Sequence, residues 1–564
     1  MKTLLDFFLF LIILCVSIII IPVVHSKCIP DQQLSLLHFK KGLVFNASFS
    51  SKLISWNSSA DCCSWVGVTC KANGCILGLD ISNEFISGGI DNSSSLFQLQ
   101  YLQSLNLAYN KLGNGFQLIP SAIGQLTSLR YLNLSHNYYS GQIPIEISHL
   151  TGLKVLDFSY NNFRLPESPL KLESPNLHML VENLTELREL FLDEVQISAP
   201  GSVWCQAISS SLSNLRVLSL SNCSLSGPFH ESLAKLQFTL SLIHLDYNNI
   251  SAPVSPFFAN FSNLTSLSLR DCGLHGTFPK EIFQLPSLQS IDLSHNPQLD
   301  GSLPEFPKNG SLEYLILEWT NFSGPLPNSI GNLKMLSAIF IHDCNFTGSI
   351  PISMTNLSQL IYLEMDGNKF EGSIPSFSRP MNLEVLGLDS NRLTGNINCT
   401  HWGNLTKLSS LSLRGNMLNG NIPTSLLSLP SLNFLDLYGN QFFGQFPEIS
   451  NISSNFVKYL LLGSNNLEGP IPMSIFNFRR LTWLDLSSNN FSGSFPLDDL
   501  QQLRNLSDLR LSDNNLFLTH DATNFSYSYF PQFQFLMLAS GKLTTFPNFL
   551  RNQSKLYRLD LSDN

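Results

Sequence analysis

The sequence predicts an α/β repeat solenoid, a curved superhelix with a parallel sheet on its concave side and helical or 3-10 turns on its convex side. The pattern L-x-L-x-x-N recurs along the chain, for example as LNLSHN ending at Asn137 and LDLSSN ending at Asn489. Charged residues make up 13% of the 564 residues, about half of the ~25% usual in globular proteins. An apolar content of 43% excludes a disordered chain, and a net charge of −9 removes nucleic acid as an expected partner.

Each repeat has a physical reason for its spacing. When the last residue of the pattern is taken as a marker, the chain contains twenty units, and the interval from Asn248 to Asn368 holds five consecutive steps of 24 residues. This period is typical of leucine-rich repeats. The two Leu of L-x-L point to one face of a short strand, so that stacked repeats share one core. The marker Asn is expected to bind buried turn amides, and Cys223, Cys272 and Cys344 replace it in three repeats.

Residues 1–26 are predicted to be a signal peptide. An apolar run from Phe7 to Ile21 is followed by Pro22 and by a small-residue cleavage pattern before Lys27. An uncleaved anchor is the alternative, but the run is shorter than the ~20 residues that a span needs. In a secreted chain the Asn-x-Ser/Thr sites are expected to carry glycans. These sites are Asn46, Asn57, Asn92, Asn133, Asn183, Asn222, Asn249, Asn260, Asn263, Asn309, Asn321, Asn345, Asn356, Asn398, Asn404, Asn451, Asn490, Asn505, Asn524 and Asn552.

Residues 27–76 contain no repeat and are expected to cover the first edge of the core. Four cysteines fall here, and an exported chain favours disulfides. Because adjacent Cys62 and Cys63 cannot easily pair with each other, we expect the pairs Cys28–Cys62 and Cys63–Cys70. The pairing of Cys75, Cys205 and Cys399 stays open. The C-x-x-C spacing of zinc sites is absent, so no metal is expected.

The repeats are expected to fill residues 77–564, with irregular loops near 162–183 and 199–210. There the interval between markers lengthens to 34 and then to 28 residues, although simple drift in repeat length is an alternative. The chain stops inside a repeat, at Asn564, with no C-terminal cap. We therefore expect an N-terminal portion of a longer protein, whose remainder is where a membrane anchor would lie.

Enzymatic activity is not expected. The chain has no H-E-x-x-H, no G-x-S-x-G and no G-K-S/T motif, and the Gly-rich loop, H-R-D and D-F-G signatures of kinases are also missing. Its twelve histidines are scattered, and no nucleophile, base and orienting group converge in the sequence. No cofactor is expected.

The cap CCSWVGVTC (62–70), the G-x-I-P repeats and the signal peptide together resemble those of plant extracellular leucine-rich-repeat receptors. More narrowly, the chain resembles the receptor-like proteins and, within them, the Verticillium wilt disease-resistance group. The closer likeness lies in VENLTELREL (181–190), WCQAIS (204–209), FANFSNLTSLSLRDCGLHGTFPKEIF (258–283) and RLDLSDN (558–564).

The resemblance implies a plant-type N-terminal cap over 27–76 and a cell-surface immune or developmental receptor. It also implies passage through the secretory pathway, an extracellular position at the plasma membrane, a single type I span outside this chain, and signalling through co-receptor and adaptor receptor kinases. The ectodomain of a receptor kinase and a secreted inhibitor of cell-wall-degrading enzymes are the alternatives. The transcript beyond Asn564 would distinguish them.

A ligand-binding face is predicted from the residues seven, six, four, two and one positions before each marker. In the nine repeats with markers 195 to 391, these positions hold thirteen acids and three bases, a net charge of −10, whereas the seven later repeats give −2. Asp in the L-D-L position can also be a simple repeat preference. Acids mixed with exposed aromatic residues nevertheless favour an interface, so we expect a basic or amphipathic peptide or protein to bind there. The candidate residues are Phe191, Asp193, His244, Asp246, Tyr247, Asp271, His295, Glu318, Trp319, Phe340, His342, Asp343, Glu364, Asp366 and Asp389.

Overall fold

The computed structural model describes residues 27–113, 116–161, 169–376, 381–449, 456–520 and 530–564. The predicted signal peptide, the first part of the 162–183 loop, and the glycosylation sites Asn451 and Asn524 lie outside these ranges. The chain divides into two compact units. Unit 1 comprises Met1–Ala199 and Gln206–Ser224, and unit 2 comprises Pro200–Cys205 and Leu225–Asn564.

Unit 1 carries a sheet of short strands, one from each repeat. Strands β1 and β2 pair antiparallel at the N-terminal end, and the following strands pair in parallel, each with the next repeat. The middle residue of each three-residue strand, such as Leu105 or Leu132, is buried, because alternate side chains of a strand point to opposite faces. The strands are β1 (Val68–Cys70), β2 (Ile76–Asp80), β3 (Ser104–Asn106), β4 (Tyr131–Asn133), β6 (Val155–Asp157), β8 (Glu189–Phe191) and β9 (Val217–Ser219).

Unit 2 continues the same repeat with a longer parallel sheet, and the predicted fold class is confirmed. Equivalent residues of successive repeats lie opposite each other, as Leu315 and Ile339 do. The strands are β10 (Leu242–His244), β11 (Ser266–Ser268), β13 (Ser290–Asp292), β15 (Tyr314–Ile316), β17 (Ala338–Phe340), β19 (Tyr362–Glu364), β21 (Val385–Gly387), β23 (Ser410–Ser412), β25 (Phe434–Asp436), β27 (Tyr459–Leu461), β29 (Trp483–Asp485), β31 (Asp508–Arg510), β33 (Phe535–Met537) and β34 (Arg558–Asp560).

A second set of strands in unit 2 is formed by the segment that follows each marker. A glycine in this segment adopts positive φ, as Gly324 and Gly348 do, a conformation that costs glycine little. The strands are β12 (His275–Thr277), β14 (Gln298–Gly301), β16 (Asn321–Pro325), β18 (Asn345–Ser349), β20 (Lys369–Gly372), β22 (Arg392–Asn396), β24 (Met417–Gly420), β26 (Gln441–Gln445), β28 (Asn466–Gly469), β30 (Asn490–Pro496) and β32 (Asn515–Thr519). In unit 1, β5 (Gly141–Gln142) pairs with β7 (Leu170–Lys171) in the same manner.

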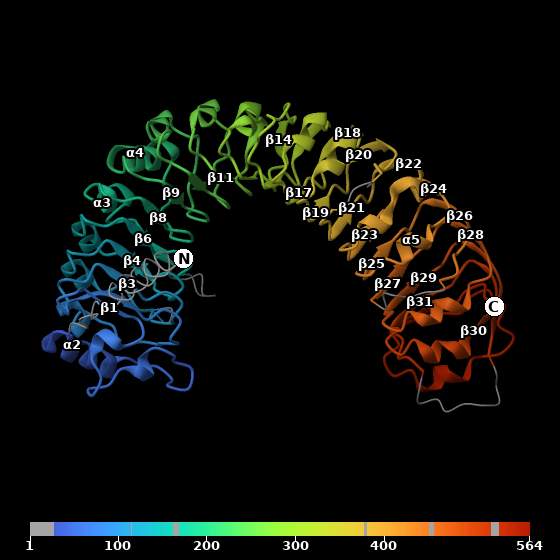
Figure 1. Ribbon diagram of the computed structural model, residues 1–564, viewed down its shortest axis with the longest axis horizontal. Coiled ribbons are helices and arrows are strands. Elements are labelled where there is room, and N and C mark those ends of the chain that lie inside the picture. Colours follow the sequence, from blue (N-terminus) through green and yellow to red (C-terminus); the bar gives the residue numbers. More distant parts are fainter. Residues whose placement is uncertain (1–26, 114–115, 162–168, 377–380, 450–455, 521–529) are drawn as a thin grey trace, which may run out of the picture. The chain divides into compact units, whose positions relative to one another are not determined.

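Short helices complete the repeats on the side away from the main sheet (Figure 1). In η9, Pro327 precedes the turn, Ile330 is buried, and the Leu333 amide donates to the Ile330 carbonyl. The 3-10 helices are η1 (Leu53–Ser55), η2 (Cys62–Ser64), η3 (Ser95–Gln98), η4 (Ser121–Gln125), η5 (Ile145–His149), η6 (Glu231–Leu236), η7 (Pro256–Asn260), η8 (Lys280–Gln284), η9 (Asn328–Asn332), η10 (Ile352–Asn356), η11 (Ile397–Thr400), η12 (Trp402–Asn404), η13 (Met473–Asn477), η14 (Leu497–Gln502) and η16 (Asn548–Asn552). The α-helices are α2 (Pro30–Gly42), α3 (Leu177–Val181), α4 (Gly201–Ser211) and α5 (Thr424–Leu427).

The loop prediction is wrong where α3 and α4 form. In α4, Trp204, Ala207 and Ile208 are buried, a spacing of three to four residues that matches one face of a helix. The extra residues of this long repeat therefore make a regular, packed helix. Among the described residues, no helix has the length and apolar character needed to cross a membrane.

Buried asparagines bind the turns together, as their position in the repeat predicts. The Asn296 Oδ1 accepts from the amides of Cys272 and Leu274, and its Nδ2 donates to the carbonyls of Leu269 and Leu293. Cys272 uses its thiol to donate to the Leu245 carbonyl instead. Marker Asn and Cys side chains of this kind thus connect their own repeat with the preceding one.

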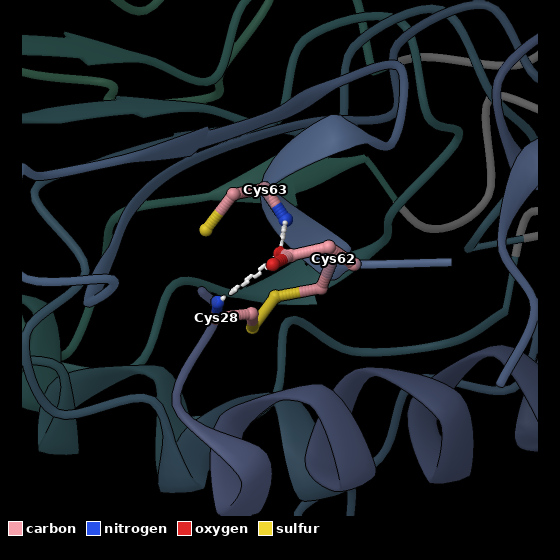
Figure 2. A group of neighbouring side chains, drawn as sticks. Cys28, Cys62 and Cys63 are labelled. Carbon is pink, nitrogen blue, oxygen red and sulfur yellow. Dashed lines mark hydrogen bonds between the residues drawn. A yellow bond between two sulfur atoms is a disulfide. The ribbon is translucent and has the colours of Figure 1, made fainter. Parts of the chain in front are cut away.

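The N-terminal segment forms a disulfide-linked cap around Asp61. Cys28 is joined to Cys62 and Cys63 to Cys70, with Cα–Cα distances of 5.6 and 5.5 Å, and these are the pairs expected from the sequence. The Asp61 Oδ1 accepts from the amides of both Cys28 and Cys63 (Figure 2). Possible metal ligands gather here at Cys28, Asp61, Cys62 and Cys63, but the three sulfur atoms of this group are used in disulfides. Cys75 and Cys205 are buried outside these bonds, and the side chain of Cys399 lies outside the described part of the structure.

Candidate ligand-binding face

One face of the main sheet in unit 2 is built from side chains that point away from the core. In β19 the side chain of Leu363 enters the core, while Tyr362 and Glu364 lie on the opposite face. Parallel pairing sets Phe340 beside Glu364 and Ala338 beside Tyr362. The same residues of successive repeats therefore form rows that cross the strands.

A cluster of charged side chains is centred on Glu318, whose side chain is only 15% exposed. Its Oε1 lies 3.2 Å from Arg270 Nη1 and 3.6 Å from His295 Nε2, and its Oε2 lies 3.3 Å from His342 Nε2. Arg270 lies two repeats before Glu318 and also donates to Ser294 Oγ. These contacts hold Glu318 within the face, with part of its charge balanced.

His342 also faces two more acids. Its Nδ1 is 3.9 Å from Glu364 Oε2, and ligand atoms of His342, Glu364 and Asp366 all lie within 4.8 Å of one another. Burial raises the pKa of Glu364, and the neighbouring Asp366 raises it further, while His342 lowers it. Burial likewise raises the pKa of Asp366.

Aromatic side chains lie on the same face as the charged cluster. Trp319 is 52% exposed and stacks on His295, with ring centroids 6.1 Å apart and planes inclined by 10°. Phe340 stacks on Tyr362 at 6.1 Å. Tyr247 is also exposed. The predicted combination of acids and aromatic side chains thus occurs on one described face.

The residue immediately before the marker has a left-handed backbone, which sequence reasoning missed. Trp319 has φ 56°, and Tyr247, His295 and Asp343 have similar values. A bulky residue rarely adopts this conformation. The signal was present in the sequence, because Gly367, Gly415 and Gly439 occupy the same place in other repeats.

Not every predicted residue belongs to this face. Phe191 and Asp193 lie in unit 1. Asp193 is buried, and its Oδ1 accepts from Ser219 Oγ and the Ser221 amide. Its inclusion among exposed ligand-binding residues is therefore wrong, since its carboxylate stabilises a turn.

Two further acids are less available than the sequence suggests. Asp246 uses Oδ1 to accept from Ser268 Oγ and the Arg270 amide. Asp389 is half-buried, and burial raises its pKa to about 6. By contrast, Asp271 and Asp343 are exposed. The predicted residue His244 has its Nε2 2.9 Å from Ser266 Oγ.

The charge of the face is smaller than the sequence count of −10. Unit 2 holds ten of the thirteen acids and one of the three bases, a net −9 if all ionise. Burial also raises the pKa of Asp292, Glu364, Asp366 and Asp389. The face is therefore negative at neutral pH and becomes less so in mild acid.

The predicted glycosylation sites are compatible with the structure. Among the described residues, none of the sequon asparagines is buried. Asn133, Asn345 and Asn404 are half-buried, and the amide of Ser135 donates to the Asn133 side chain. Occupancy stays a prediction.

Comparisons with known proteins agree with this architecture. A leucine-rich-repeat N-terminal domain model matches residues 29–71, a leucine-rich-repeat region model matches 82–297, and a leucine-rich-repeat model matches 311–333 and 480–503. Among relatives, Receptor-like protein 6 of Arabidopsis thaliana is 32% identical over 331 residues, covering 56% of this chain and 28% of that protein. Receptor-like protein Cf-9 of Solanum pimpinellifolium is 31% identical, covering 55% and 31%. The match thus spans less than a third of these relatives' length.

Solved structures with this fold include two plant receptor ectodomains. The Arabidopsis receptor kinase HAESA, in complex with the peptide hormone IDA and the co-receptor SERK1, superposes with a TM-score of 0.78 at 26% identity. The alignment covers 95% of this chain and 90% of that one. The plant peptide hormone receptor RGFR1, in complex with RGF2, gives 0.71 at 26% identity, covering 89% and 83%.

Proposed function

Since this chain is a leucine-rich-repeat protein that resembles the plant receptor-like proteins, we propose that it is a receptor ectodomain for an extracellular peptide or protein ligand. The ligand is basic or amphipathic and binds the face of unit 2 around Glu318 and Trp319. The observation that carries this proposal is the exposed Trp319, stacked on His295 beside a cluster of acids. The similar HAESA and RGFR1 ectodomains are solved with peptide hormones bound, which supports a ligand of the same kind.

Trp319 has the properties of an energetic anchor. Large aromatic side chains in partly desolvated surroundings contribute most of the affinity at many interfaces. Its left-handed backbone is a conformation that costs a bulky residue roughly 1–2 kcal/mol. The same conformation occurs immediately before the marker in most repeats, so it belongs to the turn, and Trp319 is distinguished by its size and exposure.

The acids around Trp319 supply long-range attraction and selectivity. Complementary charge increases the association rate, and salt screens it over about 10 Å at 0.1 M ionic strength. Binding is therefore expected to weaken with salt. It should also weaken in mild acid, because the raised pKa values of Glu364 and Asp366 mean that these acids are neutralised at higher pH than ordinary carboxyls.

The test begins with peptides selected from a random displayed library on the secreted chain. We expect the selected peptides to be enriched in Lys, Arg and aromatic residues. The double variant Trp319→Gly/Asp343→Lys should lose this binding. Glycine suits the backbone at 319, so the variant should stay folded.

Glu371→Lys is the matched control. Glu371 is exposed and belongs to β20 in the second set of strands, so it undergoes the same charge reversal away from the face. Equal affinity of wild type and the double variant for the selected peptides would refute the assignment of this face. Enrichment of peptides without basic residues would refute the charge argument.

Signalling is proposed to proceed through co-receptor and adaptor receptor kinases at the outer face of the plasma membrane, in an immune or developmental response. This follows the resemblance to receptor-like proteins such as Cf-9. The ectodomain of a receptor kinase is the second candidate, because HAESA is described as a receptor kinase. Sequencing the transcript beyond codon 564 would separate the two.

A further inference from the structure

His342, Glu364 and Asp366 come from two adjacent repeats whose backbones are fixed relative to each other. The amide of Ile341 donates to the Glu364 carbonyl, and the amide of Asp343 donates to the Asp366 carbonyl, both at 2.9 Å. The three side chains therefore project from a hydrogen-bonded sheet and its continuation, which keeps their separation nearly constant. Their ligand atoms lie within 4.8 Å of one another.

The imidazole of His342 is oriented by a carboxylate on its other side. Its Nε2 lies 3.3 Å from Glu318 Oε2, and the His342 side chain is only 18% exposed. A carboxylate beside Nε2 favours the tautomer that carries the proton there. The lone pair is then on Nδ1, the nitrogen that lies 3.9 Å from Glu364 Oε2. This is the arrangement in which metal-binding histidines are usually held.

The Nδ1 atom is buried and has no hydrogen-bond partner among the described residues. Its distance of 3.9 Å to Glu364 Oε2 is too long for a hydrogen bond. Two ligands that each lie ~2.1 Å from one tetrahedral cation are about 3.4 Å apart, so the two atoms need to approach by only about 0.5 Å to share one. The gap is thus too wide for a shared proton and suits a shared metal ion.

We propose that His342 Nδ1, Glu364 and Asp366 bind a divalent transition-metal ion of the Zn²⁺ class. One nitrogen and two carboxylates suit Zn²⁺, whereas Ca²⁺ takes six to eight oxygen ligands. Three protein ligands leave at least one coordination position for water or for a donor atom of a bound molecule. Glu318 is the positioning residue for His342. The site does not depend on the proposed peptide ligand.

The experiment titrates Zn²⁺ alone into the secreted full chain, after chelation and desalting, by calorimetry at fixed pH. Wild type should bind one Zn²⁺ per chain. The affinity of His342→Ala for Zn²⁺ should be at least about tenfold weaker. Glu364→Gln should show a similar loss, and Glu318→Gln should weaken binding by about tenfold through His342. Ca²⁺ should bind wild type at least about tenfold more weakly than Zn²⁺.

His295→Ala is the matched control, because His295 also touches Glu318 but is not among the three clustered ligands. It should keep the Zn²⁺ affinity of wild type. Circular dichroism of the metal-free proteins checks folding, and Glu364→Gln carries the test if His342→Ala misfolds. Coinciding Zn²⁺ isotherms for wild type and these ligand variants would overturn the proposal. An equal loss in His295→Ala would also overturn it, since that result indicates general attraction to an acidic surface.

Discussion

Replacing Asn296 by Ala should open the solenoid locally at that repeat. Asn296 is fully buried, and its Oδ1 is a shared acceptor for the amides of Cys272 and Leu274 at 3.0 and 2.9 Å. Alanine leaves both buried donors without this acceptor. Each unsatisfied buried donor costs about 1–3 kcal/mol, so the two together cost about 2–6 kcal/mol. The contact between the two repeats is destabilised by this amount, because the amides belong to the repeat before Asn296.

Hydrogen exchange with mass spectrometry is the suitable assay, since a repeat array need not unfold in one step. A loss of 2 kcal/mol corresponds to about 30-fold faster exchange, and we expect at least this acceleration in the peptide covering residues 269–276. Asn328→Ala is the control, because Asn328 is exposed at the start of η9. Unchanged exchange of this peptide in Asn296→Ala would show that the shared acceptor does not bind the repeats together.

Three other outcomes follow from the structure. Although burial raises the pKa of Glu84, hydrogen bonds from Ser50 and the neighbouring residues lower it overall; its contribution to stability is therefore present above about pH 4.5. That contribution is lost as pH falls through the lowered pKa. In thermal melts, the melting temperature of Glu84→Gln should therefore fall less with decreasing pH than that of wild type. Cys63→Ser should reduce secretion, measured by immunoblot of the medium, and finding all four cap cysteines as free thiols in secreted protein would contradict this. Phe322→Ala should cost about 3–5 kcal/mol of local stability, measured as faster hydrogen exchange of the peptides around Phe322, because this side chain is fully buried against Phe283. The exposed Phe443→Ala should change little.

The sequence predicts the strands well because their signal is local. In L-x-L the two apolar residues must share a face, and the marker Asn fixes the turn that follows, so both features repeat in the structure. The sequence does not predict helix α4, because this segment departs from the other repeats in its length and not in its composition. Its buried Trp204 and Ile208 have helical spacing, but only packing against neighbouring repeats decides that the segment is a helix and not a loop.

The site was predictable only in part. Positions before the marker place Glu318 and Trp319 on one face, but the side chain of Glu318 is only 15% exposed. It pairs with Arg270, 48 positions earlier in the chain. Such contacts depend on rotamers across two repeats, which no periodic pattern specifies. Burial is the other missing quantity, since Asp193 and Asp343 occupy the face positions of their repeats and differ in exposure.

The strands of the main sheet in unit 2 are evenly spaced, and this spacing limits how a peptide can match them. Neighbouring strands lie about 4.8 Å apart, whereas an extended peptide advances about 3.4 Å per residue. A peptide lying across the strands therefore falls out of step with the repeats and returns to step only after about seven residues, or about five repeats. Side chains of such a peptide can match the rows of the sheet at only a few places. Specificity should concentrate in one or two repeats, such as those of Trp319 and Asp343, while the remaining repeats tolerate sequence change.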